Sequence, residues 1–457
     1  MENESMAAII YVARDIERAL GTLPSPRYFI ISNDSPYARS VKEKYLDFVM
    51  LVESPIPLDT FEILEKGETA AFIEKKCGKE KPQIVVFKNT VRIEELCAEK
   101  GWRLLNPPTA LAEKIENKIT QAEWLGELAG LLPSFVIAPA KKIKWQKKPL
   151  VLQWAHAHTG LGTIVVNDAA TLAALQEKFP DRPAKASEFI KGPTFTINIV
   201  VTSAKADTSL EVAFGADSAE SPLGRRAREG ARLEHETTRT LKENVSAGAL
   251  QIAVGNISYQ ITGMPPLTDS PFATVGNDWS LPYSLLNERH LDELRDIAKK
   301  VGAKMSESGW RGLFGIDVIY DEERDQFKLI EINARQPAST TYESQLQSRF
   351  RGQGLVGATI FEAHLAALTD SSLTEKQIEI NDGAQLVQRV TKRVPEVQPR
   401  VRTEKIADLN AAGYTTIPYP NTKLNSDFLR IQSDKGLMEK HGKWNARGEK
   451  IIKILEK

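Results

Sequence analysis

Two carboxylates, an amide and a guanidinium near residue 320 are the side chains best suited to chemistry in this chain of 457 residues. Asp317 and Glu331 lie in two apolar segments joined by the charged stretch 321–326, which predicts a β-hairpin with both carboxylates on one face. Asn333 and Arg335 follow Glu331 at steps of two, so the period of a strand points them the same way. Mg²⁺ prefers such oxygen donors and completes its shell with water and substrate phosphates. We therefore predict metal ligands at Asp317, Glu331 and Asn333, and catalytic residues at Arg335 and Asn333.

The neighbours of the two carboxylates argue against a hairpin that is merely solvated. Each carboxylate stands between two aliphatic residues, so polar groups are expected on a strand pair that is largely buried. Burying them without a metal or counter-ion costs several kcal/mol. The guanidinium fork of Arg335 can hold a phosphate or a developing acyl phosphate. The pattern therefore favours a site that binds metal and phosphate.

This arrangement resembles the metal-binding signature of the ATP-grasp superfamily, in the form Gly315-Ile-Asp317 followed by Leu329-Ile-Glu331-Ile-Asn333-Ala-Arg335. Three earlier segments resemble other parts of the family's nucleotide site and occur in the family's order: Asn117-Lys118, Gly160-Leu-Gly162-Thr163 and Ser187-Glu188-Phe189-Ile190-Lys-Gly192. The order and spacing of the four segments, more than any one of them, carry the resemblance. It covers roughly residues 110 to 370.

The resemblance implies roles for the nucleotide-binding residues. Lys118 is expected to contact the phosphates. The lid loop and the hinge against adenine are expected to supply the remaining contacts, from Gly160, Gly162, Thr163, Glu188, Phe189 and Ile190. Many family members also carry a phosphate-binding lysine on the strand before the lid loop, where this chain has Gln153. A neutral amide adds no charge, so either the lid histidines His156 and His158 or an arginine compensate, or ATP binding is weaker.

The flanking segments predict an α/β fold of the α+β ATP-grasp type. Residues 1–110 alternate apolar strands with helices, which is typical of a small parallel α/β domain. Residues 111–370 are assigned to a two-part ATP-grasp domain with a lid at about 133–186, and residues 371–457 to a small C-terminal subdomain. Helical periodicity predicts one helix over 111–132, ended by a proline. The predicted metal site belongs to the second of these domains.

The composition excludes several classes of function. Sixty basic residues balance sixty acidic ones, so no net charge attracts a nucleic acid or an anionic membrane. Two cysteines are too few for a disulfide framework or a structural zinc site. The N-terminus carries acidic residues and a broken apolar run, so we expect no signal peptide there. No stretch is apolar for long enough to span a membrane, so we expect no spanning helix. We expect a cytoplasmic protein with small-molecule partners, no nucleic acid and no membrane, and we leave a homodimer open.

The resemblance implies an ATP-dependent carbon–nitrogen ligase that forms ADP. Such an enzyme activates a carboxylate as an acyl phosphate with Mg-ATP, and an amine then displaces phosphate. ATP and two Mg²⁺ ions are the expected cofactors, with Mn²⁺ as a substitute, and the arginines of 225–232 are candidates for binding the carboxylate. Two alternatives stay open, an ATP-binding regulatory or degenerate protein without turnover and a biotin-carboxylase-like carboxylase. A scaffold for a protein or RNA partner has no support from the charge.

Overall fold

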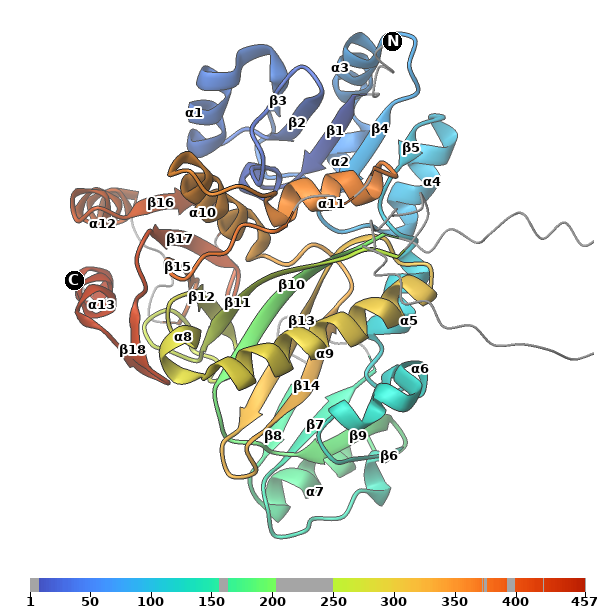
Figure 1. The fold of residues 1–457 in the computed structure, drawn as a ribbon, viewed down its shortest axis with the longest axis vertical. Coiled ribbons are helices and arrows are strands. Elements are labelled where there is room, and N and C mark those ends of the chain that lie inside the picture. Colours follow the sequence, from blue (N-terminus) through green and yellow to red (C-terminus); the bar gives the residue numbers. More distant parts are fainter. Residues whose placement is uncertain are drawn as a thin grey trace, which may run out of the picture.

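The computed structural model describes residues 8–155, 163–202, 250–371, 373, 376–392, 399–421 and 423–456. A five-stranded, an eight-stranded and a four-stranded sheet form its framework, and Figure 1 shows them from top to bottom in that order. None of the helices in these residues is both long and apolar enough to cross a membrane.

The five-stranded sheet is parallel and has the strand order β3-β2-β1-β4-β5. Its strands are β1 (Ile9–Ala13), β2 (Tyr28–Asn33), β3 (Val49–Val52), β4 (Gln83–Val86) and β5 (Arg103–Leu104). Apolar cores lie on both faces, as the continuously apolar strands require. The helices that cover them are α1 (Pro36–Tyr45), α2 (Thr60–Glu65), α3 (Gly67–Cys77), α4 (Val91–Glu99) and, from much later in the chain, α11 (Ile360–Leu368). The prediction of a small parallel α/β domain is confirmed.

The four-stranded sheet is antiparallel, with the order β6-β9-β7-β8. Its strands are β6 (Phe135–Pro139), β7 (Leu150–Trp154), β8 (Thr163–Val166) and β9 (Pro183–Glu188). Helix α7 (Ala169–Lys178) packs on one face, where Leu152, Trp154 and Ala184 are buried beside Leu172. The alternation of strand side chains therefore turns Gln153 and Lys185 to the opposite face.

The eight-stranded sheet is antiparallel, in the order β14-β13-β10-β11-β12-β15-β17-β16. Its strands are β10 (Thr194–Val201), β11 (Ile252–Thr262), β12 (Thr274–Asp278), β13 (Gly312–Asp321), β14 (Gln326–Asn333), β15 (Ala384–Arg389), β16 (Thr415–Pro418) and β17 (Asp427–Ser433). Helix α9 (Glu288–Glu307) runs across it (Figure 1) and buries the apolar stripe that its periodicity predicts. Strands from residues 384–433 continue this sheet, so the C-terminal segment shares a sheet with the hairpin β13–β14.

Short elements connect these layers. The helices are α5 (Thr109–Glu116), α6 (Gln121–Leu125), α8 (Pro282–Leu285), α10 (Thr340–Gly352), α12 (Pro399–Ala411) and α13 (Ala446–Glu456). A two-stranded ribbon is formed by β18 (Met438–Lys440) and β19 (Lys443–Trp444), and 3₁₀ turns occupy Ile16–Ala19, Leu46–Phe48, Gly126–Leu131 and Ala140–Lys142.

The prediction of one continuous helix over 111–132 is wrong. Helix α5 ends at Glu116, and the chain turns through Asn117 before α6 begins. The Asn117 side chain accepts a hydrogen bond from the Ile119 amide (3.0 Å), and the Lys118 amide donates to the carbonyl of Ala155 at the end of β7 (3.1 Å). A tertiary hydrogen bond thus replaces the helical one, and the break holds Lys118 between the two antiparallel sheets.

Candidate active site

The hairpin β13–β14 brings the predicted metal ligands onto one surface. Asp317 lies directly opposite Glu331, and Gly315 lies opposite Asn333. Residues in such direct pairs point to the same side of a sheet. The register shifts immediately after Asp317, so the carboxylate pair sits beside a bulge. The two carboxylates and the amide therefore converge as the strand period predicts.

Asp317 is the buried member of this group, with 5% of its surface exposed. Its Oδ1 accepts a hydrogen bond from the Thr196 hydroxyl (2.7 Å) and its Oδ2 from the Asn333 amide (3.3 Å). Burial, and next the neighbouring charge of Glu331, raise the pKa of Asp317 to about 6. The protein alone therefore leaves this carboxylate's negative charge poorly compensated.

A divalent cation fits the donors at this position. A cation between Asp317 and Glu331 would relieve both the burial cost and the repulsion, and each oxygen keeps a lone pair for a metal. The described residues contain no cluster of three or more His, Cys, Asp or Glu side chains suited to a metal. The predicted ligand set is two carboxylates and an amide, and a cation held there would keep coordination positions for water and phosphate oxygens.

Lys118 lies against the same centre. Its Nζ donates to Glu331 Oε1 at 3.1 Å, and the lysine is 5% exposed while the glutamate side chain is 41% exposed. A buried ammonium that faces a partly solvated carboxylate can also meet an anionic ligand entering from the open side. The structure therefore brings Lys118 to Glu331, one of the predicted metal ligands, and its contact with phosphate stays a prediction.

Arg335 is held in place at the end of the hairpin. Its Nη1 donates to Asn333 Oδ1 (2.7 Å) and lies 3.4 Å from Glu116 Oε1, which also accepts from the Ala334 amide (2.9 Å). Sequence reasoning missed Glu116, whose only signal is its position two residues before Lys118. It also missed Lys88. Burial lowers the pKa of Lys88, while the nearby charge of Glu116 raises it and that of Arg335 lowers it, which places the lysine near both residues.

The predicted adenine hinge joins the four-stranded sheet to the hairpin. The carboxylate of Glu188 accepts from the Ser134 amide (3.1 Å) and pairs with Arg324 in the β13–β14 turn (3.0 Å). Phe189 is 37% exposed and Ile190 is 8% exposed. The Glu188 side chain thus links the two sheets, and adenine recognition by the hinge stays a prediction.

The lid is only partly described. Gln153 Nε2 donates to the Thr163 hydroxyl across the β7–β8 pair (3.3 Å). His158, Gly160 and Gly162 lie outside the described residues, as do the arginines of 225–232. The predictions for these residues remain untested.

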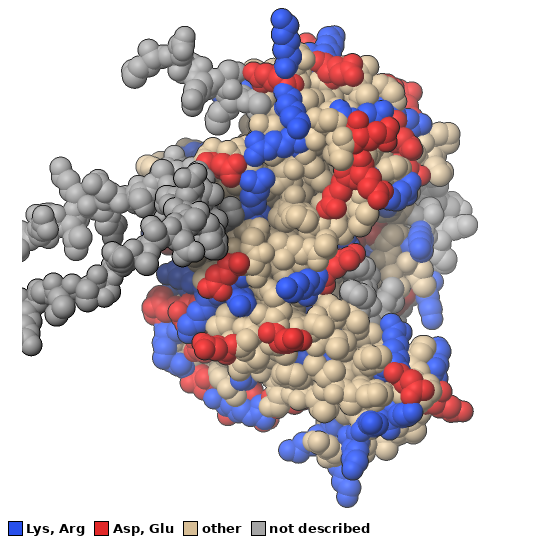
Figure 2. Space-filling model, turned by 90° about the vertical axis from the view of Figure 1, so that its right-hand side faces the viewer, with Lys and Arg blue, Asp and Glu red and all other residues tan. Residues whose placement is uncertain are grey.

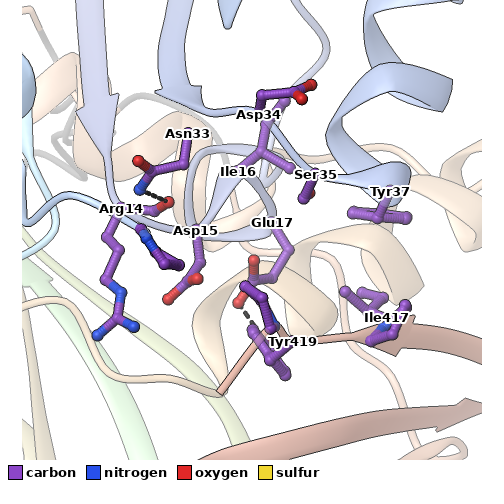
Figure 3. A pocket seen from close by; sticks show the side chains of 13 residues that line it. Arg14, Asp15, Ile16, Glu17, Asn33, Asp34, Ser35, Tyr37, Ile417 and Tyr419 are labelled. Carbon is purple, nitrogen blue, oxygen red and sulfur yellow. Dashed lines mark hydrogen bonds between the residues drawn. The ribbon is translucent and has the colours of Figure 1, made fainter. Parts of the chain in front are cut away.

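A hollow lies where the carboxyl ends of β1 and β2 face the end of β16 and the residues that follow it (Figure 3). Ligands of open α/β sheets bind at such strand ends. Burial, and next the charge of Glu17, raise the pKa of Asp15 to about 6, and Glu17 accepts a hydrogen bond from the Tyr419 hydroxyl. Gln336 is the residue after Arg335 at the end of the hairpin. Its Nε2 donates a hydrogen bond to the carbonyl of Arg18 (2.8 Å), which follows Glu17 of the hollow in the chain.

Both signs of charge occur on the face of the molecule that Figure 2 shows. Figure 2 shows Lys and Arg side chains interspersed with Asp and Glu over one face of the molecule. This agrees with the balanced composition of the chain.

Comparisons with known proteins identify the fold. No protein family model and no curated protein matches the sequence. The structure is similar to N5-carboxyaminoimidazole synthase from Aspergillus clavatus in complex with ADP and 5-aminoimidazole ribonucleotide, at 14% identity and a TM-score of 0.57 over 99% of both chains. It is also similar to the biotin carboxylase domain of Hydrogenobacter thermophilus 2-oxoglutarate carboxylase in complex with MgADP, at 12% identity and a TM-score of 0.56 over 95% of this chain and 87% of that one.

A third solved structure gives the same result. It is biotin carboxylase from Campylobacter jejuni, at 12% identity and a TM-score of 0.56 over 94% of this chain and 89% of that one. These similarities extend over nearly the whole chain and confirm the predicted ATP-grasp fold.

Proposed function

We propose that this protein is an Mg-ATP-dependent ligase that phosphorylates a carboxylate and couples the resulting acyl phosphate to an amine, releasing ADP and phosphate. The observation that carries the proposal is the convergence of Asp317, Glu331 and Asn333 on one face, with the buried Lys118 paired to Glu331. These are oxygen donors for a hard cation and an ammonium for phosphate oxygens, at one point of a fold shared with ATP-binding enzymes.

The chain's own residues contribute position and charge to this reaction. Bound Mg²⁺ would neutralise phosphate charge and help align the γ-phosphoryl group. Lys118 would hold a phosphate oxygen beside Glu331, and Arg335, fixed by Asn333 and Glu116, would stabilise charge on the carboxyl being activated. A nucleophilic side chain is not required, because the substrate carboxylate attacks the phosphoryl group and the amine attacks the acyl carbon.

Bicarbonate is a specific candidate for the carboxyl substrate. The similar structures include a biotin carboxylase domain and an N5-carboxyaminoimidazole synthase, both matched over most of their length. At this low identity the two similarities show the fold alone. The substrate of this chain therefore has to be identified by assay. The carboxylase alternative is therefore tested beside amino acids and other small carboxylates.

The test is substrate-dependent nucleotide turnover. The protein is incubated with Mg-ATP, pooled amines and either pooled carboxylates or bicarbonate, and ADP, AMP, phosphate and pyrophosphate are measured. We expect ADP and phosphate in equal amounts, and we expect Glu331→Gln to lower turnover at least about 100-fold because a metal ligand loses its charge. Asp292→Asn on the exposed face of α9 is the control and should retain activity. Formation of AMP and pyrophosphate, or full activity of Glu331→Gln, would contradict the proposal.

A further inference from the structure

A second lysine, Lys185 in β9, is buried next to the candidate phosphate site and has no anionic partner among the described residues. It is 2% exposed. No carboxylate or other acceptor in the described part of the chain accepts a hydrogen bond from its Nζ, whose recorded contact is the ring of Phe135 at 5.1 Å. Lysine is almost never fully buried unless it is paired. Within the part of the chain that the structure describes, this cation therefore has no ion-pair partner.

The surroundings of Lys185 increase that deficit. Burial, and next the positive charge of Lys118, lower the pKa of Lys185 to about 8. Lys118 is in turn paired with the metal-site carboxylate Glu331. Two buried ammonium groups thus act on one another beside a pair of carboxylates, an arrangement suited to a polyanion bound together with a divalent cation.

Strand register relates Lys185 to the uncharged position in β7. Gln153 and Lys185 are directly opposed residues of the antiparallel pair β7–β9. Their side chains therefore share a face, and the Cβ atoms of such pairs lie about 4.5–5.5 Å apart. This face is turned away from α7, whose apolar partners in β7 and β9 are Leu152, Trp154 and Ala184. A charge at position 185 can therefore reach nearly the same space as a charge at position 153.

Resting on the function proposed above, we propose that Lys185 binds the phosphates of the nucleotide and supplies from β9 the charge that Gln153 does not supply from β7. Phosphate oxygens give the buried ammonium its missing acceptor. Lys118 and Lys185 then bind the same polyanion from two sides, and Gln153 adds a neutral hydrogen bond. Lys185 contacts the nucleotide directly, whereas Phe135 packs against its side chain.

Equilibrium binding of ATP, ADP and adenosine tests this role, with wild-type protein, Lys185→Gln and the exchange variant Gln153→Lys/Lys185→Gln. We expect Lys185→Gln to weaken binding of ATP and ADP by about 10- to 100-fold, the usual effect of losing a hydrogen bond to a charged group, and to leave adenosine binding unchanged. The exchange variant should recover most of the ATP affinity, because it returns one charge to the same face. Lys141→Gln, in an exposed ion pair with Asp181, is the matched control and should bind like wild type.

Thermal unfolding without nucleotide separates a ligand contact from a structural one. Lys185→Met should be at least as stable as wild type, since it removes a buried charge that has no partner. Unchanged ATP affinity in Lys185→Gln, or equal weakening of ATP and adenosine binding, would overturn the proposal for Lys185. Neither outcome would change the turnover expected of the wild-type protein or of Glu331→Gln in the ligase assay. Failure of the wild-type protein to bind ATP would instead refute the proposed function itself.

Discussion

Asp317 gives a prediction in which stability and function move in opposite directions. In the absence of ligand, its carboxylate is buried beside Glu331, and its pKa is raised to about 6 from an ordinary value of 3.8. A carboxyl whose pKa is higher in the folded state stabilises the fold at low pH, and this contribution is lost as pH rises through the folded pKa. Replacement by asparagine removes the titration. We therefore expect Asp317→Asn to become progressively more stable relative to wild type as the pH increases.

The size of the effect follows from the pKa difference. A shift of about two units corresponds to about 3 kcal/mol, at about 1.4 kcal/mol per unit. The variant keeps the acceptor for Thr196, but its amide nitrogen opposes the Asn333 amide, and the lost hydrogen bond costs about 1 kcal/mol at every pH. The free energy of unfolding of the variant, relative to wild type, should thus rise by roughly 2.4 kcal/mol between pH 4 and pH 7 and be about 2 kcal/mol in favour of the variant at pH 7.

Urea denaturation with a chelator, at several pH values between 4 and 8, measures this difference. Asp296→Asn, on the exposed side of α9, controls for the loss of one negative charge and should show little pH dependence. Addition of Mg-ATP should reverse the order, because ligand at 100 times its Kd stabilises wild type by about 2.7 kcal/mol and the variant has lost a metal ligand. A stability difference that stays constant from pH 4 to pH 7 would refute the account of a desolvated carboxylate beside Glu331.

Two further predictions concern the scaffold around the site. Burial lowers the pKa of His364 to about 3, and its Nδ1 accepts a hydrogen bond from the Leu313 amide (3.0 Å). Between pH 6.5 and pH 3 this histidine is protonated in the unfolded chain and neutral in the folded one. The free energy of unfolding therefore falls as the solution is acidified. His364→Asn should lose that acid sensitivity, about 2 kcal/mol at pH 5 by urea denaturation, and an unchanged acid slope would contradict the assignment. Gly192→Ala would place a Cβ 1.9 Å from the Tyr320 carbonyl oxygen, whereas a Cβ at Gly130 meets nothing within 4 Å. Thermal unfolding should show Gly192→Ala clearly destabilised and Gly130→Ala close to wild type, and equal midpoints would show that the hinge tolerates a side chain.

The hairpin β13–β14 and the pairing of its carboxylates could be predicted from sequence because their geometry is local. Asp317 and Glu331 occupy strands joined by a short charged turn, and the strand period fixes which side chains share a face. The same local logic applies to α9, whose apolar residues follow the helical period and are buried. The sequence pattern is reliable where a single element carries the signal.

The partners of individual side chains depended on tertiary structure. Helical periodicity across 111–132 gave no sign that the chain breaks at Lys118, since the break is stabilised by the carbonyl of Ala155 in another sheet. Nor did the sequence indicate that Glu188 pairs with Arg324 across two sheets. Such contacts join residues far apart in the chain, and only the packing of the sheets decides them.

The sequence by itself determined which side chains share one face of the hairpin β13–β14, because residue type and a period of two suffice to place Asp317, Glu331 and Asn333 together there. Tertiary structure alone decided where the second positive charge lies. Pairing of β7 with β9 sets Lys185 opposite Gln153, and strand pairing is a long-range choice that no local periodicity records.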